Sequence, residues 1–202
     1  MKAKVKILSS SAGYDLAATA YDTKAKYLNS FEQGKLLPLL GDVVGKKVLD
    51  AGAGTGRLAV ELARLGAEVT ALDASSEMLK ILHGKNNHIQ TVVRDMEQMP
   101  FSAGSFVWVV AAFAIVHLKN PTRFFDECYR VLKPDGSLIV TNINQKEAPL
   151  VDTKLGQIKI ESFYHRPEQV REELESLAFG IEQEIFIKEA GVWVNQIIIA
   201  RK

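Results

Sequence analysis

The chain has 202 residues, of which 47% are hydrophobic and 24% are charged, and its formal net charge is +1. This length and balance predict one globular domain with a proper core, and the near-zero net charge argues against nucleic acid as the default partner. The single cysteine, Cys128, excludes an intrachain disulfide. No segment approaches the roughly 20 apolar residues of a membrane span. The lysine-rich N-terminus does not resemble a secretory signal, so we expect a cytoplasmic protein without membrane contact.

The segment before the first predicted strand is expected to be mainly helical. Residues 1–13 predict a short lysine-rich arm followed by a flexible link. Tyr14 and Tyr21 then stand seven residues apart, which places both rings on one face of a helix. A second helix is predicted over residues 23–40, although a glycine and a proline inside it weaken the pattern.

Residues 47–56 read K-V-L-D-A-G-A-G-T-G and are the most informative stretch of the chain. An apolar run, alternating glycines and a periodic apolar segment predict a strand, a tight turn and a helix. Glycines let a ligand reach the backbone, and the free N–H groups at a helix start favour an anionic group. The residues expected to bind a ligand at this corner are Asp50, Ala51, Gly52, Gly54 and Gly56.

The glycine spacing distinguishes between two ligand classes. Dinucleotides use G-x-G-x-x-G, but this chain has G-x-G-x-G, with Arg57 in the place of the last glycine of the dinucleotide pattern. The spacing therefore favours S-adenosylmethionine (SAM), whose amino-acid end carries a carboxylate and an ammonium group. Asp50 is the candidate partner of the ammonium group. The alternative is a turn that binds nothing.

Two later strands are predicted to end in acidic residues. The second strand covers 67–73, and Asp73 at its end lies about twenty residues beyond the turn, so one crossover places its carboxylate where it can accept from both ribose hydroxyls. As an alternative, this aspartate caps the following helix. Met78 of that helix is expected beside the adenosine or in the core. The third strand, 88–95, ends at Asp95.

The remaining elements complete an α/β sheet. Residues 106–113 form an almost unbroken apolar run, typical of a central parallel strand buried on both faces, and Ala112 is expected at its end beside the sulfonium of SAM. The elements predicted after it are a helix over 121–132, a strand over 137–143, a helix over 167–179 and two short-linked strands around Gly191. Together they predict a Rossmann-like, doubly wound, seven-stranded mixed sheet with a C-terminal antiparallel hairpin.

Several short motifs follow one another in order along the chain. They are D-A-G-A-G-T-G at 50–56, A-L-D at 71–73, R-D-M-E at 94–97, M-P-F at 99–101, F-A-I-V-H-L at 113–118 and R-V-L-K-P-D-G at 130–136. Together they resemble the class I SAM-dependent methyltransferases that act on small molecules. The resemblance covers roughly residues 45–143. It implies a single methyltransferase domain over 1–202, composed of a helical lid at 1–44, a SAM-binding core at 45–143 and an acceptor-side segment, helix and hairpin at 144–202.

The resemblance also implies roles for residues outside the glycine turn. In the family, an acidic residue at the position of Asp95 accepts from the adenine amino group, and the backbone N–H of the next residue, here Met96, meets a ring nitrogen. Small methyltransferases often have a similar N-terminal tyrosine segment over the cofactor, with Tyr21 a stronger candidate than Tyr14. A histidine is common at the position of His117, near the cofactor. Packing roles are the alternative for these tyrosines and this histidine.

Residues 144–166 are expected to contribute to the acceptor side. The stretch lacks a clear period and is long for a structureless loop, which favours a functional role. Relatives often show an H-R-P sequence like that at 165–167, so His165 is the candidate catalytic residue. The alternative is a packing role at the start of the following helix. No metal-ligand spacing occurs in the sequence, and we expect no metal.

These features predict transfer of a methyl group from SAM to a small-molecule acceptor by in-line displacement, with S-adenosylhomocysteine as the other product. The protein mainly has to align the acceptor and exclude water. A general base is needed only for a protonated acceptor, and the sequence leaves His165, His117, Tyr164 and Tyr21 open for that role. The alternatives are a noncatalytic SAM-binding or regulatory module, an NAD-dependent oxidoreductase and a macromolecule methyltransferase.

Overall fold

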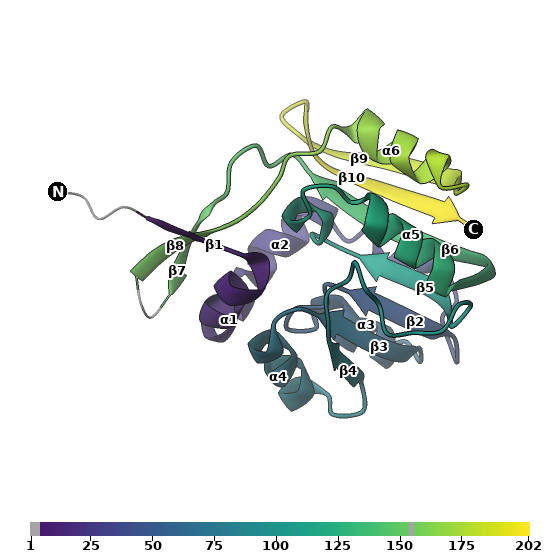
Figure 1. Ribbon diagram of the computed structural model, residues 1–202, viewed down its shortest axis with the longest axis horizontal. Coiled ribbons are helices and arrows are strands. Elements are labelled where there is room, and N and C mark those ends of the chain that lie inside the picture. The colour runs from purple at the N-terminus through teal and green to yellow at the C-terminus, as the bar shows by residue number, and fades with distance from the viewer. Residues whose placement is uncertain (1–4, 154–155) are drawn as a thin grey trace.

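The computed structural model of the chain describes residues 5–153 and 156–202, and a mixed sheet forms its centre. The strands of this sheet are β2 (Lys47–Ala51), β3 (Glu68–Asp73), β4 (Gln90–Val93), β5 (Phe106–Ala111), β6 (Leu132–Ile143), β9 (Gly180–Glu189) and β10 (Val192–Arg201). Their order is β4-β3-β2-β5-β6-β10-β9 (Figure 1). The first five are parallel, and β10 is antiparallel to both β6 and β9. The predicted seven-stranded mixed sheet with a terminal hairpin is confirmed.

Helices cover both faces of this sheet. Val170 and Leu174 of α6 (Pro167–Ser176) pack with α5 (Thr122–Val131) in one hydrophobic cluster, and Leu79 and Leu82 of α4 (Ser76–Lys85) pack with α3 (Arg57–Arg64) in another. Successive strand residues alternate between the clusters: Val109 belongs to the first and Val110 to the second. This is the two-sided burial expected of parallel strands. Within the described ranges, no helix combines the length and the apolar character that a bilayer crossing needs.

The N-terminal segment differs from its prediction. Helix α1 (Ser10–Tyr21) begins at Ser10, so the flexible link expected there is wrong, and the start of the expected arm, residues 1–4, lies outside the described part of the chain. The single helix predicted over 23–40 is broken into η1 (Asp22–Lys24), α2 (Ala25–Glu32) and η2 (Leu37–Leu40). Positive φ angles at Gln33 and Gly34 end α2, because a helix cannot continue through them.

A small second sheet was not predicted. Strand β1 (Lys6–Leu8) pairs in parallel with β8 (Gly156–Ile160), which pairs antiparallel with β7 (Leu150–Thr153). In Figure 1 this sheet projects away from the central sheet beside α1. Strand β1 is thus joined to the stretch 144–166. That stretch contains two strands rather than a structureless loop.

Candidate active site

The glycine turn lies at the carboxyl end of β2. Gly52, Gly54 and Gly56 have φ angles of +77°, +55° and +87°, which L-residues rarely adopt. A Cβ added to Gly52 would lie 2.9 Å from the Cβ of Ala114, and one added to Gly56 would lie 2.2 Å from Leu82. A Cβ on Gly54 would meet nothing within 4 Å. Two glycines therefore permit close packing, and Gly54 leaves free space in front of the backbone.

Asp73 is fixed beside this turn, as its position at a strand end predicts. Its Oδ2 accepts the N–H of Gly54 at 2.8 Å, and its Oδ1 accepts the N–H of Ser75 at 2.8 Å. Burial raises the pKa of Asp73, while these two backbone bonds act in the opposite direction. The N-cap of α4 is Ser75, whose hydroxyl accepts from the N–H of Met78, so Asp73 is not needed as the side-chain cap.

Asp50 lies behind the turn with an unsatisfied acceptor. The residue is 2% exposed, and its buried Oδ2 has no hydrogen-bond partner among the described residues. Burial raises its pKa to about 7, Arg57 opposes the rise and Asp73 adds to it. Asp50 lines a recess of about 30 Å³ together with Gly54 and Tyr21. A buried carboxylate oxygen without a donor suits an ammonium ligand, since buried polar atoms are normally paired.

A pocket of about 310 Å³ opens in front of the turn. The sequence-predicted residues that line it are Tyr21, Gly52, Gly54, Asp73, Met78, Asp95, Met96, Ala112 and His117. Ala51 and Gly56 line neither this pocket nor the recess, because Ala51 is fully buried in β2 and the space beside Gly56 is filled by Leu82. Both residues shape the turn, and their contacts with a ligand stay a prediction.

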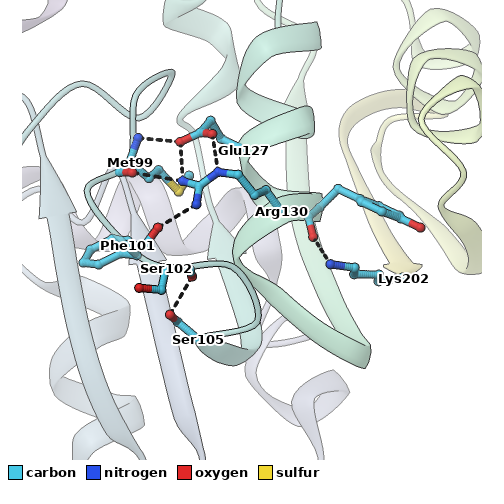
Figure 2. A network of polar contacts seen from close by, with 8 residues as sticks. Met99, Phe101, Ser102, Ser105, Glu127, Arg130 and Lys202 are labelled. Atoms are coloured by element: carbon cyan, nitrogen blue, oxygen red, sulfur yellow. Dashed lines mark hydrogen bonds and ion pairs between the residues drawn. The ribbon is translucent and has the colours of Figure 1, made fainter.

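The loop that carries Asp95 and Met96 is anchored to α5 (Figure 2). Arg130 donates to the carbonyl of Phe101 at 2.6 Å and to that of Met99 at 3.0 Å, and it forms an ion pair with Glu127 at 2.7 Å. The carboxylate of Glu127 also accepts the N–H of Met99 at 2.7 Å. A guanidinium fork that satisfies two carbonyls and a carboxylate fixes the course of the loop. Sequence reasoning missed this anchor, although both residues belong to the predicted helix.

A second pocket, of about 130 Å³, adjoins the first, and the two share four lining residues, which we call the wall. Tyr14, Tyr21, Phe113 and His117 line both pockets. The other residues that line the second pocket are Leu28, Phe31, Val116, Ile143, Gln145, Pro149, Val151 and Ile160. They come from α2, the 3-10 helix after β5, the end of β6, the segment that follows it and the small sheet, so the stretch 144–166 contributes to this pocket. Phe113 has a φ angle of +58° at the end of β5, and sequence reasoning missed its place in the wall.

His117 and Tyr14 are hydrogen-bonded within this wall. The Oη of Tyr14 lies 2.7 Å from Nε2 of His117, and Nδ1 of His117 lies 2.8 Å from the carbonyl oxygen of Glu161. Burial lowers the pKa of His117 and raises that of Tyr14. Burial also raises the pKa of Tyr21 to about 12, so this hydroxyl stays protonated at neutral pH.

The structure does not favour His165 as a catalytic group. Its side chain is 4% exposed, and its Nε2 lies 3.0 Å from the carbonyl oxygens of both Ile115 and Leu118. Carbonyl oxygens only accept, so Nε2 carries the proton and has no lone pair free for a substrate. His165 lines neither pocket. These contacts fix the segment after β5 to the start of α6, which is the packing role that the sequence left open, and a catalytic role of His165 stays a prediction.

Known proteins similar to this chain are methyltransferases. Residues 49–140 match a family model described as a methyltransferase domain. A ubiquinone biosynthesis O-methyltransferase of Xanthomonas oryzae pv. oryzae is 38% identical over 112 residues, which are 53% of this chain and 47% of that protein. A demethylmenaquinone methyltransferase of Clavibacter sepedonicus is 32% identical over 149 residues, which are 70% of this chain and 60% of that protein. The chain thus matches about half the length of these curated relatives.

A solved structure extends the comparison to most of the fold. The SAM-dependent methyltransferase of Mesorhizobium loti superposes with a TM-score of 0.73 at 16% identity, over 85% of this chain and 98% of that chain. At such identity the likeness concerns the fold. Residues 49–140 are therefore similar to a methyltransferase domain, and the fold of the whole chain is similar to that of this solved structure.

Proposed function

We propose that the protein binds SAM in the pocket of about 310 Å³ and transfers its methyl group to a small apolar acceptor in the pocket of about 130 Å³. One observation carries the proposal. The two pockets share a wall, and the first of them begins at the glycine turn. A donor and an acceptor bound in these pockets would be neighbours, and the transfer requires that the pockets open to each other beside the shared residues, so that the reacting atoms touch.

The described residues offer partners for the amino-acid, ribose and adenine groups of SAM. The free space at Gly54 admits a ligand to the backbone, and the unpaired Oδ2 of Asp50 offers a partner for the ammonium group. Asp73 would accept from the ribose hydroxyls with the lone pairs that its two backbone bonds leave over. Asp95 and Met96 would meet the adenine.

The chemistry that SAM supplies when bound is a methyl group on a sulfonium: the S–CH₃ bond breaks as the bond from the acceptor to the methyl carbon forms, and the electron pair stays on sulfur. The chain contributes alignment and exclusion of water through α1, α2 and the small sheet, whose residues line the acceptor side. The relatives named for ubiquinone and demethylmenaquinone chemistry agree with an apolar acceptor. Action in the cytoplasm and absence of a nucleic-acid substrate stay predictions.

Calorimetry with SAM and, separately, with NAD tests the cofactor assignment. We expect SAM to bind, NAD not to bind, and Asp73→Ala to lose most of the SAM affinity because the ribose hydroxyls lose their acceptor. Asp126→Ala replaces an exposed aspartate of α5 and should bind like the wild type. Tight NAD binding without SAM binding, or unchanged SAM affinity in Asp73→Ala, would refute the assignment.

Incubation with SAM and a metabolite extract tests the reaction. We expect S-adenosylhomocysteine to accumulate only when both are present. Binding of SAM without turnover against extracts of several kinds would favour the noncatalytic SAM-binding module.

A further inference from the structure

We propose that Tyr14 and His117 act together as the general base, and that the acceptor they serve is an uncharged compound that is methylated on a hydroxyl oxygen. This inference rests on the proposed function and adds to it a catalytic pair and a class of acceptor. Both residues line the cofactor pocket and the acceptor pocket, so the pair lies where the two reactants would meet.

The direction of the hydrogen bonds follows from the carbonyl group of Glu161. A carbonyl oxygen cannot donate, so Nδ1 of His117 must carry a proton and donate to it over 2.8 Å. In the neutral ring Nε2 is then an acceptor, and the hydroxyl of Tyr14 donates to it over 2.7 Å. The oxygen of Tyr14 keeps lone pairs that can accept a hydrogen bond from a molecule in the acceptor pocket.

The acceptor pocket favours an uncharged molecule. Among the described residues that line it there is no lysine, arginine, aspartate or glutamate, and apart from the Tyr14–His117 pair its polar side chains are those of Tyr21 and Gln145. An ammonium or carboxylate group would lose its hydration there without gaining a charged partner. An uncharged hydroxyl group can enter, but it is a weak nucleophile until its proton is removed.

The proton of the acceptor hydroxyl reaches His117 in two transfers through Tyr14. As the acceptor oxygen attacks the methyl carbon, its proton passes to Oη of Tyr14, and the proton of Tyr14 passes to Nε2 of His117. The acceptor becomes a neutral methyl ether, Tyr14 remains a phenol, and His117 becomes an imidazolium whose Nδ1–H stays bonded to Glu161. The imidazolium returns its proton to solvent after the product leaves.

The surroundings keep the pair in the required protonation states. Tyr21 packs edge-on to Tyr14 with ring centroids 5.7 Å apart, and the charge of Asp73 further disfavours ionisation of Tyr14. His117 faces Tyr14 on one side and the carbonyl of Glu161 on the other. Its pKa is lowered by burial, so the ring is neutral and can accept a proton at neutral pH.

Methylation of phenols of different acidity tests whether Tyr14 and His117 remove the proton of the acceptor. The variants are Tyr14→Phe, which keeps the ring, and His117→Asn, whose amide can replace the Nδ1–H donor but not Nε2. Tyr129→Phe, in which the ring against Phe179 remains, is the control. With un-ionised phenol as acceptor, both variants should lose about 100-fold or more in kcat/KM. With 4-nitrophenol at mildly alkaline pH, where it is already ionised, the loss of kcat/KM in both variants should be much smaller than with phenol, because no proton has to be removed from the acceptor.

Equal losses with both phenols would show that the pair is structural and would overturn the proposal. Methylation of thiol or amine probes by a wild-type protein that methylates no phenol would overturn the assignment to hydroxyl acceptors.

Nitrogen NMR of the histidine-labelled protein gives a readout that does not depend on turnover. The resonances of His117, identified by their loss in His117→Asn, should show a proton on Nδ1 and none on Nε2. Added phenol should shift the Nε2 resonance in the wild type but not in Tyr14→Phe. A proton on Nε2, or no shift at phenol concentrations up to the solubility limit, would overturn the proposal. Failure to bind SAM would instead refute the proposed function, because this experiment requires no SAM.

Discussion

Asp50 carries an electrostatic cost that a ligand could remove. Its carboxylate is buried, one oxygen has no donor, and its pKa is raised to about 7, chiefly by burial. A carboxyl group with a raised folded-state pKa favours the folded state while it is protonated. The contribution of Asp50 to stability is therefore greatest below about pH 4 and falls as pH rises to about 7. Over this range the loss is of the order of 4 kcal/mol.

Because an ammonium group should bind only the ionised carboxylate, SAM affinity is expected to depend on pH. As pH falls from about 7 to about 5, the affinity should weaken up to tenfold per unit, since each unit costs about 1.4 kcal/mol of ionisation. Calorimetry at a series of pH values measures this slope. Asp50→Asn should bind SAM weakly, with an affinity that does not change with pH in this range. In urea unfolding, the free energy of unfolding of this variant should rise relative to that of the wild type between about pH 4 and 7. A flat affinity profile in the wild type would contradict the ammonium contact.

Polar contacts fasten the N-terminal helices to the core, among them three that involve carboxylates of these helices. Asp15 of α1 accepts from the hydroxyl of Ser75 at 2.6 Å, and Asp22 accepts from that of Thr55 at 2.6 Å. At the end of α2, Glu32 forms two parallel bonds with Arg57, of 2.7 and 2.8 Å. Since α1 and α2 form part of the pocket walls, these contacts determine how closely the pockets are covered.

The Glu32–Arg57 pair is the contact with the largest expected energy. Glu32 is 4% exposed, so Glu32→Gln leaves a largely buried guanidinium without its carboxylate and should cost about 3 kcal/mol. Glu61→Gln breaks an ion pair with Arg64 whose side chains are 43% and 70% exposed, and it should cost less than about 0.5 kcal/mol. Urea unfolding of the two variants measures the difference. Similar losses of unfolding free energy in Glu32→Gln and Glu61→Gln would mean that the Glu32–Arg57 pair does not hold α2 in place.

At the scale of the whole molecule, the sequence predicted the central sheet and the cofactor side. Strand ends such as Asp73 and the glycine turn come together because parallel strands finish at one edge, so local patterns were enough. The acceptor side could not be predicted in this way. It depends on the pairing of Lys6 with Ile158 across some 150 residues, and β1 has only three residues, too few for a periodic signal. The packing contacts of His165 could not be predicted because its partners are two backbone carbonyl groups, which leave no signal in a sequence.

The contact between α1 and the small sheet lies beside the acceptor pocket. Gly13 of α1 lies against Ile160 of β8, which also lines that pocket, and a Cβ added to Gly13 would come within 2.7 Å of Cγ1 of Ile160. Gly84 of α4 is a matched control, because it is also helical and a Cβ there would meet nothing within 4 Å. Neither glycine has a positive φ angle, so backbone strain does not distinguish them.

Gly84→Ala should therefore gain up to about 1 kcal/mol of stability from helix propensity, whereas Gly13→Ala should lose stability because α1 and β8 are forced apart. Hydrogen exchange monitored by mass spectrometry should show faster exchange in β1, β7 and β8 of Gly13→Ala. Exchange in the central strands β2, β3 and β5 should be unchanged. If Gly13→Ala behaved like Gly84→Ala, the small sheet would not be held by α1, and the acceptor pocket would need another support.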